Sequence, residues 1–183
     1  ENIIDSLENV KKDIDTFFSA VDLVYRFQFS GGEPFLYPNL IDIMKYTSDK
    51  YSDKIIRLEM VTNGTIIPSD EVCAFLRDYK IYVFLDDYVE SLPKKYGDNF
   101  ANVKNKFDLY EIRYIDNQVT KWMRMYPIST DRSDWTDKQM MKQFDSCRNP
   151  YSTLRKGRIA KCNYAHFASK AGICGDFQEE YYD

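Results

Sequence analysis

The sequence lacks the features of several broad protein classes. No apolar run of 18 residues occurs, so a transmembrane helix is not expected. The first residues, Glu1 to Asp5, are polar and acidic, and no signal peptide is visible. The net charge is −4 without a basic stripe, so nucleic-acid binding is not expected. These absences favour a cytoplasmic protein with no nucleic-acid or membrane partner.

Cysteine is also scarce. There are 4 cysteines, and Cys147, Cys162 and Cys174 cluster near the C-terminus. An even number is compatible with disulfides, but nothing else indicates secretion. The paired Cys-x2-Cys knuckles of structural zinc sites are absent. Cys73 lies on an apolar helical face and is predicted to pack in the core.

The 183 residues, 44% of them apolar, suffice for one domain with a small appendage. Because the chain begins with Glu1 rather than Met, we expect sequence upstream of it. Helical and strand patterns alternate along the first half, which predicts an α/β fold with a parallel sheet. The predicted helices cover residues 3–19, 36–50 and 94–106 and a segment that starts at Ser69-Asp70. The predicted strands cover residues 23–30, 55–61 and 81–85.

The strands help to choose an architecture. Tyr25, Phe27 and Phe29 alternate with polar residues, and the strand at 55–61 alternates in the same way. A doubly wound sheet is buried on both faces and needs apolar strands. The alternation therefore favours a TIM-like barrel, or part of one, with a polar interior. The alternative is that the polar residues lie at an edge or on an uncovered face.

The pattern changes after residue 107. Residues 109–114 and 122–126 are strand-like, and Asp116-Asn117 between them is turn chemistry, which predicts an antiparallel hairpin. A helix is expected from Thr136, its N-cap, to Ser146. We therefore expect one domain over residues 1–130 and a small cysteine-containing module over residues 131–183.

A glycine-rich turn, Gly31-Gly32-Glu33-Pro34, ends the first strand. Glycines permit close approach of a ligand, and the glutamate can accept hydrogen bonds from an amine. The turn lies where parallel α/β folds bind ligands, although such a pair of glycines is also found in plain tight turns. Arg26, Glu59 and Arg113 are predicted to face the same interior, where they either grip a charged substrate or pair with each other.

The segment Phe27–Pro34 resembles the second strand and glycine-rich turn of the radical S-adenosylmethionine (SAM) superfamily. The resemblance implies that the turn binds the amino group of the cofactor's methionine moiety. Thr62-Asn63-Gly64 is similar to the end of the family's next strand. Asp86 lies where the family more usually has Ser-x-Asp. The implied cofactor-binding residues are Gly31, Gly32, Glu33, Pro34, Thr62, Asn63 and Asp86.

The spacing Cys147-x9-Gly157-x4-Cys162 resembles the start of the SPASM and twitch modules, which hold an auxiliary iron–sulfur cluster. The resemblance implies that Cys147, Cys162 and Cys174 are metal ligands and that residues 154–159 form a small β-hairpin. No fourth cysteine ligand is present. His166 is a possible ligand, although a surface position is expected for it.

The family's Cys-x3-Cys-x2-Cys loop, which holds the catalytic [4Fe-4S] cluster, does not occur in this sequence. We therefore expect an N-terminally truncated piece that is inactive by itself. The resemblance implies a parent enzyme that cleaves SAM to a 5′-deoxyadenosyl radical, with a flavodoxin or ferredoxin as reductant. Its substrate, a peptide or a small molecule, is not identified.

Two other functions remain open. The chain could be a non-catalytic module that binds a cofactor or a partner, with an exposed sheet edge that invites self-association. It could also be a zinc-stabilised domain. Metal analysis distinguishes zinc from iron, and the residues upstream of Glu1 bear on the first alternative.

Overall fold

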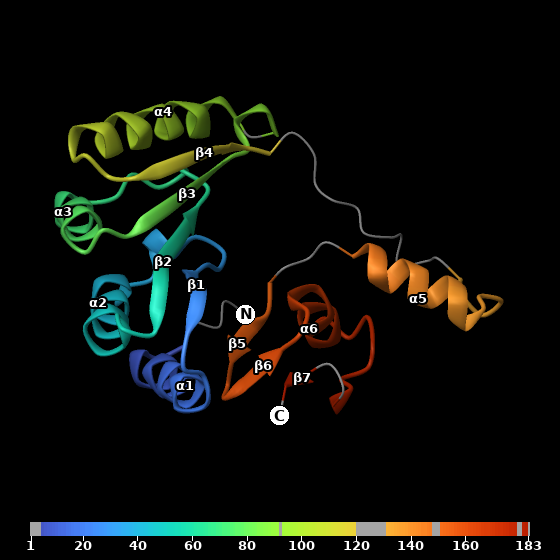
Figure 1. Cartoon of the computed structure of the whole chain (residues 1–183). Helices are drawn as coiled ribbons and strands as arrows, with labels where there is room; N and C mark the ends of the chain where they lie inside the picture. The colour runs from blue at the N-terminus through green and yellow to red at the C-terminus, as the bar shows by residue number, and fades with distance from the viewer. Residues whose placement is uncertain (1–4, 92, 120–130, 148–150, 179–180, 183) are drawn as a thin grey trace. The chain divides into compact units, whose positions relative to one another are not determined.

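The computed structural model describes residues 5–91, 93–119, 131–147, 151–178 and 181–182. The chain forms two compact units, Glu1–Thr120 and Lys121–Asp183 (Figure 1). The domain boundary expected at residue 130 lies outside the described residues. In the described part of the chain, no helix is both long and apolar enough to span a bilayer.

The first unit alternates helices and strands, as the sequence predicts. Its helices are α1 (Leu7–Ala20), α2 (Leu40–Tyr51), α3 (Asp70–Asp78) and α4 (Lys94–Leu109), with the 3-10 turns η1 (Pro34–Leu36) and η2 (Val89–Ser91). Its strands are β1 (Val24–Phe29), β2 (Ile55–Thr62), β3 (Tyr82–Asp87) and β4 (Tyr114–Gln118). Ser6 and Ser69 cap α1 and α3, each accepting a hydrogen bond from a backbone N–H in the first turn.

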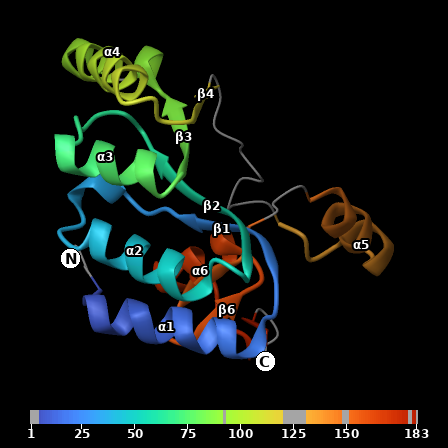
Figure 2. The ribbon, with the colours of Figure 1, turned by 60° about the vertical axis from the view of Figure 1, so that its left-hand side comes forward.

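The four strands form one parallel sheet in the sequential order β1-β2-β3-β4. Because crossovers between parallel strands are right-handed, a sequential order places the connecting helices on the same face. Figures 1 and 2 show α1 to α4 along that face. A doubly wound arrangement, with helices on both faces, is therefore excluded for these strands. The described sheet is open.

The hairpin expected over residues 109–126 is wrong where the structure describes it. Leu109 ends helix α4, and β4 pairs with β3 in parallel. Asp116 and Asn117 lie inside β4, where Asp116 binds Lys104 at 2.6 Å. Their turn chemistry is overridden because α4 provides a complete crossover, and an exposed strand tolerates polar residues. Residues 122–126 lie outside the described residues.

The helix-covered face of the sheet carries the core. Phe27 packs against Phe17 and Phe18 of α1, with ring centroids 5.6 and 5.3 Å apart. Cys73 is fully buried, which confirms its predicted place in the core. The other apolar side chains of this unit with no more than 2% exposure are Ile14, Phe18, Ile43, Met44, Met60, Leu76, Ile81, Val83, Leu85, Val103 and Phe107.

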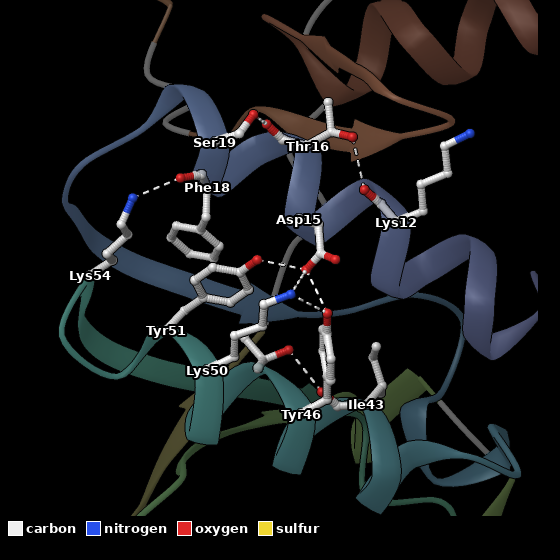
Figure 3. Close-up of polar contacts among 11 residues, drawn as sticks. Lys12, Asp15, Thr16, Phe18, Ser19, Ile43, Tyr46, Lys50, Tyr51 and Lys54 are labelled. Carbon is white, nitrogen blue, oxygen red and sulfur yellow. Dashed lines mark hydrogen bonds and ion pairs between the residues drawn. The ribbon is translucent and has the colours of Figure 1, made fainter.

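A polar network joins α1 to α2 on the outer side of this unit. Figure 3 shows Asp15 accepting hydrogen bonds from the hydroxyls of Tyr46 and Tyr51, each at 2.6 Å, and from Lys50 at 3.0 Å. Burial acts to raise the pKa of Asp15, but these three donors outweigh it and lower that pKa. Because Tyr51 also stacks on Phe18 with centroids 4.4 Å apart, the two helices are held by both polar and apolar contacts.

The second unit contains α5 (Asp137–Ser146), α6 (Asn163–Lys170) and an antiparallel sheet of β5 (Thr153–Arg155), β6 (Arg158–Ala160) and β7 (Tyr181–Tyr182). Thr136 is the N-cap of α5, as predicted, and it also forms a capping box with Gln139. The predicted small hairpin is also confirmed. Lys156 and Gly157 both have positive φ, +52° and +71°, which is the geometry of a two-residue type I′ turn.

Candidate cofactor-binding site

Glu33 joins the two turns that the sequence singled out. Its carboxylate accepts hydrogen bonds from the Thr62 hydroxyl at 2.9 and 3.0 Å and from the backbone N–H of Asn63 at 3.0 Å. It also accepts one from the backbone N–H of Phe35 at 3.1 Å. Thr62 ends β2, so this single side chain fixes the glycine-rich turn after β1 against the turn after β2. Gly31, Gly32, Thr62 and Asn63 are thereby brought together.

The environment of Glu33 is only partly open to water. Burial raises the pKa of its carboxyl group, and the hydrogen bonds from Asn63, Phe35 and Thr62 offset part of that rise. Since both carboxylate oxygens already have internal donors, Glu33 acts here by shaping the turn. Pro34, the next residue, is buried and is the first residue of η1. The chain therefore does not continue as an extended strand after Glu33.

The turn after β2 is held by its own side chains. The Asn63 side-chain oxygen accepts hydrogen bonds from the Thr65 N–H at 3.0 Å and the Thr65 hydroxyl at 2.6 Å. The Gly64 N–H donates to the Thr62 hydroxyl at 3.1 Å, and Gly64 has a φ of +66°. The chain can turn here because glycine has no Cβ to resist the left-handed conformation.

Gly31 and Gly32 border open space. Both are exposed, and a Cβ built on either would meet nothing within 4 Å. No turn or loop hydrogen bond from a described residue reaches their carbonyl oxygens. Two adjacent glycine carbonyl oxygens that receive no such bond suit an ammonium group, which needs acceptors. The turn therefore fits the amino end of an amino-acid-like ligand such as the methionine moiety of SAM.

Asp86 lies at the end of β3 on the face opposite the helices. Its carboxylate accepts hydrogen bonds from the Asn117 amide at 2.7 Å and from the Tyr88 hydroxyl at 3.3 Å. It shares the carboxyl edge of the sheet with the two turns above, because all four strands run in parallel. The assignment of Asp86 to a cofactor contact stays a prediction.

The polar face of the sheet carries a charged cluster centred on Glu59, which is 0% exposed. Arg26, Gln28 and Arg57 all bind its carboxylate, so the internal pairing that was one of two expectations is present. Arg113 does not join them: it is exposed and precedes β4. Arg57 was not predicted to belong to this cluster, although the period-2 pattern of the strand places Arg57 on the same face as Glu59.

The three C-terminal cysteines occupy separate positions. Cys147 follows α5 and is exposed, Cys162 precedes α6 and is half-buried, and Cys174 is exposed in the loop after α6. Among the residues that the structure describes, no three His, Cys, Asp or Glu side chains are grouped to hold a metal ion. The described residues therefore do not bring the three cysteines together, and the ligand assignment stays a prediction.

The expected surface position of His166 is wrong. His166 lies on the inner side of α6 and is 7% exposed. Its Nδ1 is 3.5 Å from the hydroxyl of Tyr181, which itself donates to Asp176 at 2.6 Å. Burial lowers the pKa of His166, which favours the neutral ring. His166 can be buried in this short helix because Tyr181 of β7, 15 residues later in the sequence, supplies a hydroxyl partner.

Known proteins resemble part of this chain in sequence and in fold. The chain is 28% identical over 102 residues to the antilisterial bacteriocin subtilosin biosynthesis protein AlbA of Bacillus subtilis (strain 168). That match covers 56% of this chain and 21% of AlbA. The solved structure "Native anSMEcpe with bound AdoMet" aligns with a TM-score of 0.50 at 20% identity, covering 62% of this chain and 34% of that one. It supports the fold.

A second structure of that protein, "Native anSMEcpe with bound AdoMet and Kp18Cys peptide", aligns with a TM-score of 0.48 at 20% identity, over 58% of this chain and 33% of that chain. The chain thus spans about a fifth to a third of the length of the proteins that it matches. The family model of the radical SAM superfamily matches residues 2–114, which include the Gly31-Gly32-Glu33-Pro34 turn, β2 and β3. On this match over more than half of its length, the chain belongs to the radical SAM superfamily.

Proposed function

We propose that this chain forms the cofactor-binding part of a radical SAM enzyme, a section of a barrel wall whose carboxyl edge holds the methionine end of SAM. The observation that carries the proposal is the turn at Gly31 and Gly32, where a Cβ would meet no neighbour and the carbonyl oxygens accept no turn or loop hydrogen bond from a described residue. Glu33 joins this turn to the turn after β2. In this chemistry SAM is the source of a 5′-deoxyadenosyl radical that abstracts hydrogen from the substrate.

The substrate class that we propose for the whole enzyme is a peptide. Its support is the similarity to AlbA, a protein of bacteriocin biosynthesis. The chain's own part is to bind and orient the cofactor. Its four cysteines include no Cys-x3-Cys-x2-Cys set for the catalytic cluster, so cofactor cleavage is not assigned to any residue of this chain.

The proposal predicts that SAM binds at the glycine-rich turn. Gly32→Val fills the open space with a branched side chain, and it should weaken SAM binding by at least about tenfold. Because a Cβ at Gly32 meets no neighbour, the melting temperature should stay unchanged. Saturation-transfer NMR with SAM measures the binding, and Ala101→Val, on the exposed side of α4, is the matched control. Equal SAM binding by Gly32→Val and the wild type would reject this site.

We further propose that the second unit binds an auxiliary cluster through Cys147, Cys162 and Cys174. The β5–β6 hairpin between the first two cysteines supports it. After anaerobic reconstitution, Cys147→Ala should lose most of the bound iron, whereas Cys73→Ala, at a buried core position, should retain it. Unchanged iron in Cys147→Ala would remove Cys147 from the ligands. The reconstituted chain alone should form no 5′-deoxyadenosine.

A further inference from the structure

The charged cluster on the open face of the first unit carries more positive charge than its own pairing needs. Arg26 binds both oxygens of Glu59, through Nε at 2.9 Å to each and through Nη2 at 2.8 Å to Oε2. Gln28 adds a hydrogen bond to Oε2 at 3.0 Å. One arginine and one amide therefore already satisfy the buried carboxylate. Arg57 is a second guanidinium on the same carboxylate, and the cluster has a net charge of +1.

Arg57 uses only one edge of its guanidinium inside the protein. Its Nε binds Oε1 of Glu59, while its side chain is 34% exposed. Among the described residues, its two terminal nitrogens have no hydrogen-bond partner. These nitrogens carry four N–H donors in a planar fork, which matches the two oxygens of a carboxylate. The fork is therefore presented to a ligand.

Aromatic rings hold the Arg57 fork in place. Its guanidinium carbon lies 4.9 Å from the ring centroid of Tyr82, 5.8 Å from that of Tyr25 and 5.9 Å from that of Phe84. Rings on several sides limit the rotamers of the side chain, so less entropy is lost on binding. They also lower the local dielectric constant, which strengthens attraction for an incoming anion. The exposed edge of the Arg57 guanidinium and the rings around it together form a site that can bind an anion through two hydrogen bonds.

We propose that Arg57 binds the side-chain carboxylate of an acidic residue in the peptide substrate. Charge complementarity favours this occupant, because Arg57 is a second guanidinium on a carboxylate that Arg26 already binds. Arg57 lies six residues before Asn63, or about 20 Å along the strand. It therefore holds a part of the peptide that is remote from the cofactor. The inference rests on the proposed function for the peptide nature of the substrate.

The probe is the capped peptide acetyl-Gly-Gly-Glu-Gly-Gly-amide, titrated into the ¹⁵N-labelled chain while the Nε–Hε signal of Arg57 is followed by NMR. A saturable shift is expected, and the matched glutamine peptide should cause none. Arg57→Lys keeps a charge near Glu59 but loses the fork, so binding, followed by backbone amide shifts, should weaken by about tenfold. Arg113→Lys, at an exposed arginine outside the cluster, should bind like the wild type.

Three results would overturn the proposal: equal shifts with the glutamine peptide, equal shifts with sodium acetate at the same concentration, or undiminished binding by Arg57→Lys. If only an uncapped glutamine peptide shifts the signal, the ligand is a chain end and the acidic side chain is rejected. The SAM-binding experiment separates the two proposals. SAM binding by the wild-type chain without any response to the glutamate peptide rejects the peptide site alone. A response to the peptide without SAM binding rejects the cofactor site.

Discussion

Replacing Glu59 by glutamine is expected to lower the free energy of unfolding of the first unit by about 3–5 kcal/mol, because two guanidiniums then lie around a buried group without charge. Glu59 has no exposed surface, and Arg26, Gln28 and Arg57 all donate to it. Glutamine has nearly the same shape, so the loss reports the missing charge rather than a cavity. Urea unfolding followed by circular dichroism measures it.

The matched control is Glu8→Gln, which removes a carboxylate that is 81% exposed and pairs with Lys11. No measurable change is expected there, because exposed ion pairs contribute little. Arg57→Gln should cost much less than Glu59→Gln, since Arg26 and Gln28 still satisfy the carboxylate. Comparable losses for Glu59→Gln and Glu8→Gln would show that Glu59 is not the buried centre of the cluster.

Gly64→Ala is expected to destabilise the same unit by about 2–4 kcal/mol. Part of the cost is the left-handed backbone, with φ of +66°, which disfavours any residue with a Cβ. The rest is overpacking, because the new Cβ would lie 2.6 Å from the Phe100 ring and 3.0 Å from the Leu85 side chain. The same urea experiment measures the loss. SAM binding should fall as well, since Gly64 adjoins Thr62 and Asn63.

Two glycines provide controls for Gly64→Ala. Gly31→Ala meets no neighbour and needs no positive φ, so it should leave the stability unchanged. Gly157→Ala, in the second unit, combines a φ of +71° with open space and should show the backbone cost alone, about 1–2 kcal/mol. Surface substitutions usually change the free energy of unfolding by no more than about 0.5 kcal/mol. A change of that size or smaller in Gly64→Ala would contradict the packing described around this turn.

The elements of the first unit were largely readable from the sequence. Apolar residues at helical spacing predicted α1 and α2, and serine at Ser69 marked the start of α3. The alternation in β1 and β2 predicted one polar face, and the sequential strand order agrees with it. These signals are local: capping and periodicity act over a few residues, so neighbouring sequence is enough to express them.

The predictions that proved wrong, the hairpin over residues 109–126 and the surface position of His166, depend on contacts between residues that are distant in the sequence. Asp116 and Asn117 have turn propensity, but pairing of β4 with β3 across helix α4 decides their conformation. His166 is polar, but the Tyr181 hydroxyl makes its burial possible from 15 residues away. Propensity carries no information about such partners.

For the candidate site, too, the local turns could be predicted from the sequence and the contacts between them could not. The motif Gly31-Gly32-Glu33-Pro34 and the turn Thr62-Asn63-Gly64 indicated the cofactor end of the sheet, because glycine and proline have local backbone consequences that a sequence reveals. The sequence did not reveal that the Glu33 carboxylate is occupied by Thr62, Asn63 and Phe35. That contact needs two strand ends to lie side by side.

The sequence by itself determined the α/β alternation, the family and the two turns at the carboxyl edge. Only the tertiary structure decided which side chains share one carboxylate. It gave Glu59 two arginines, excluded Arg113 and left the fork of Arg57 available. The physical reason is that pairing of buried charges depends on strand register and distance in space, whereas turns and caps depend on the residues beside them.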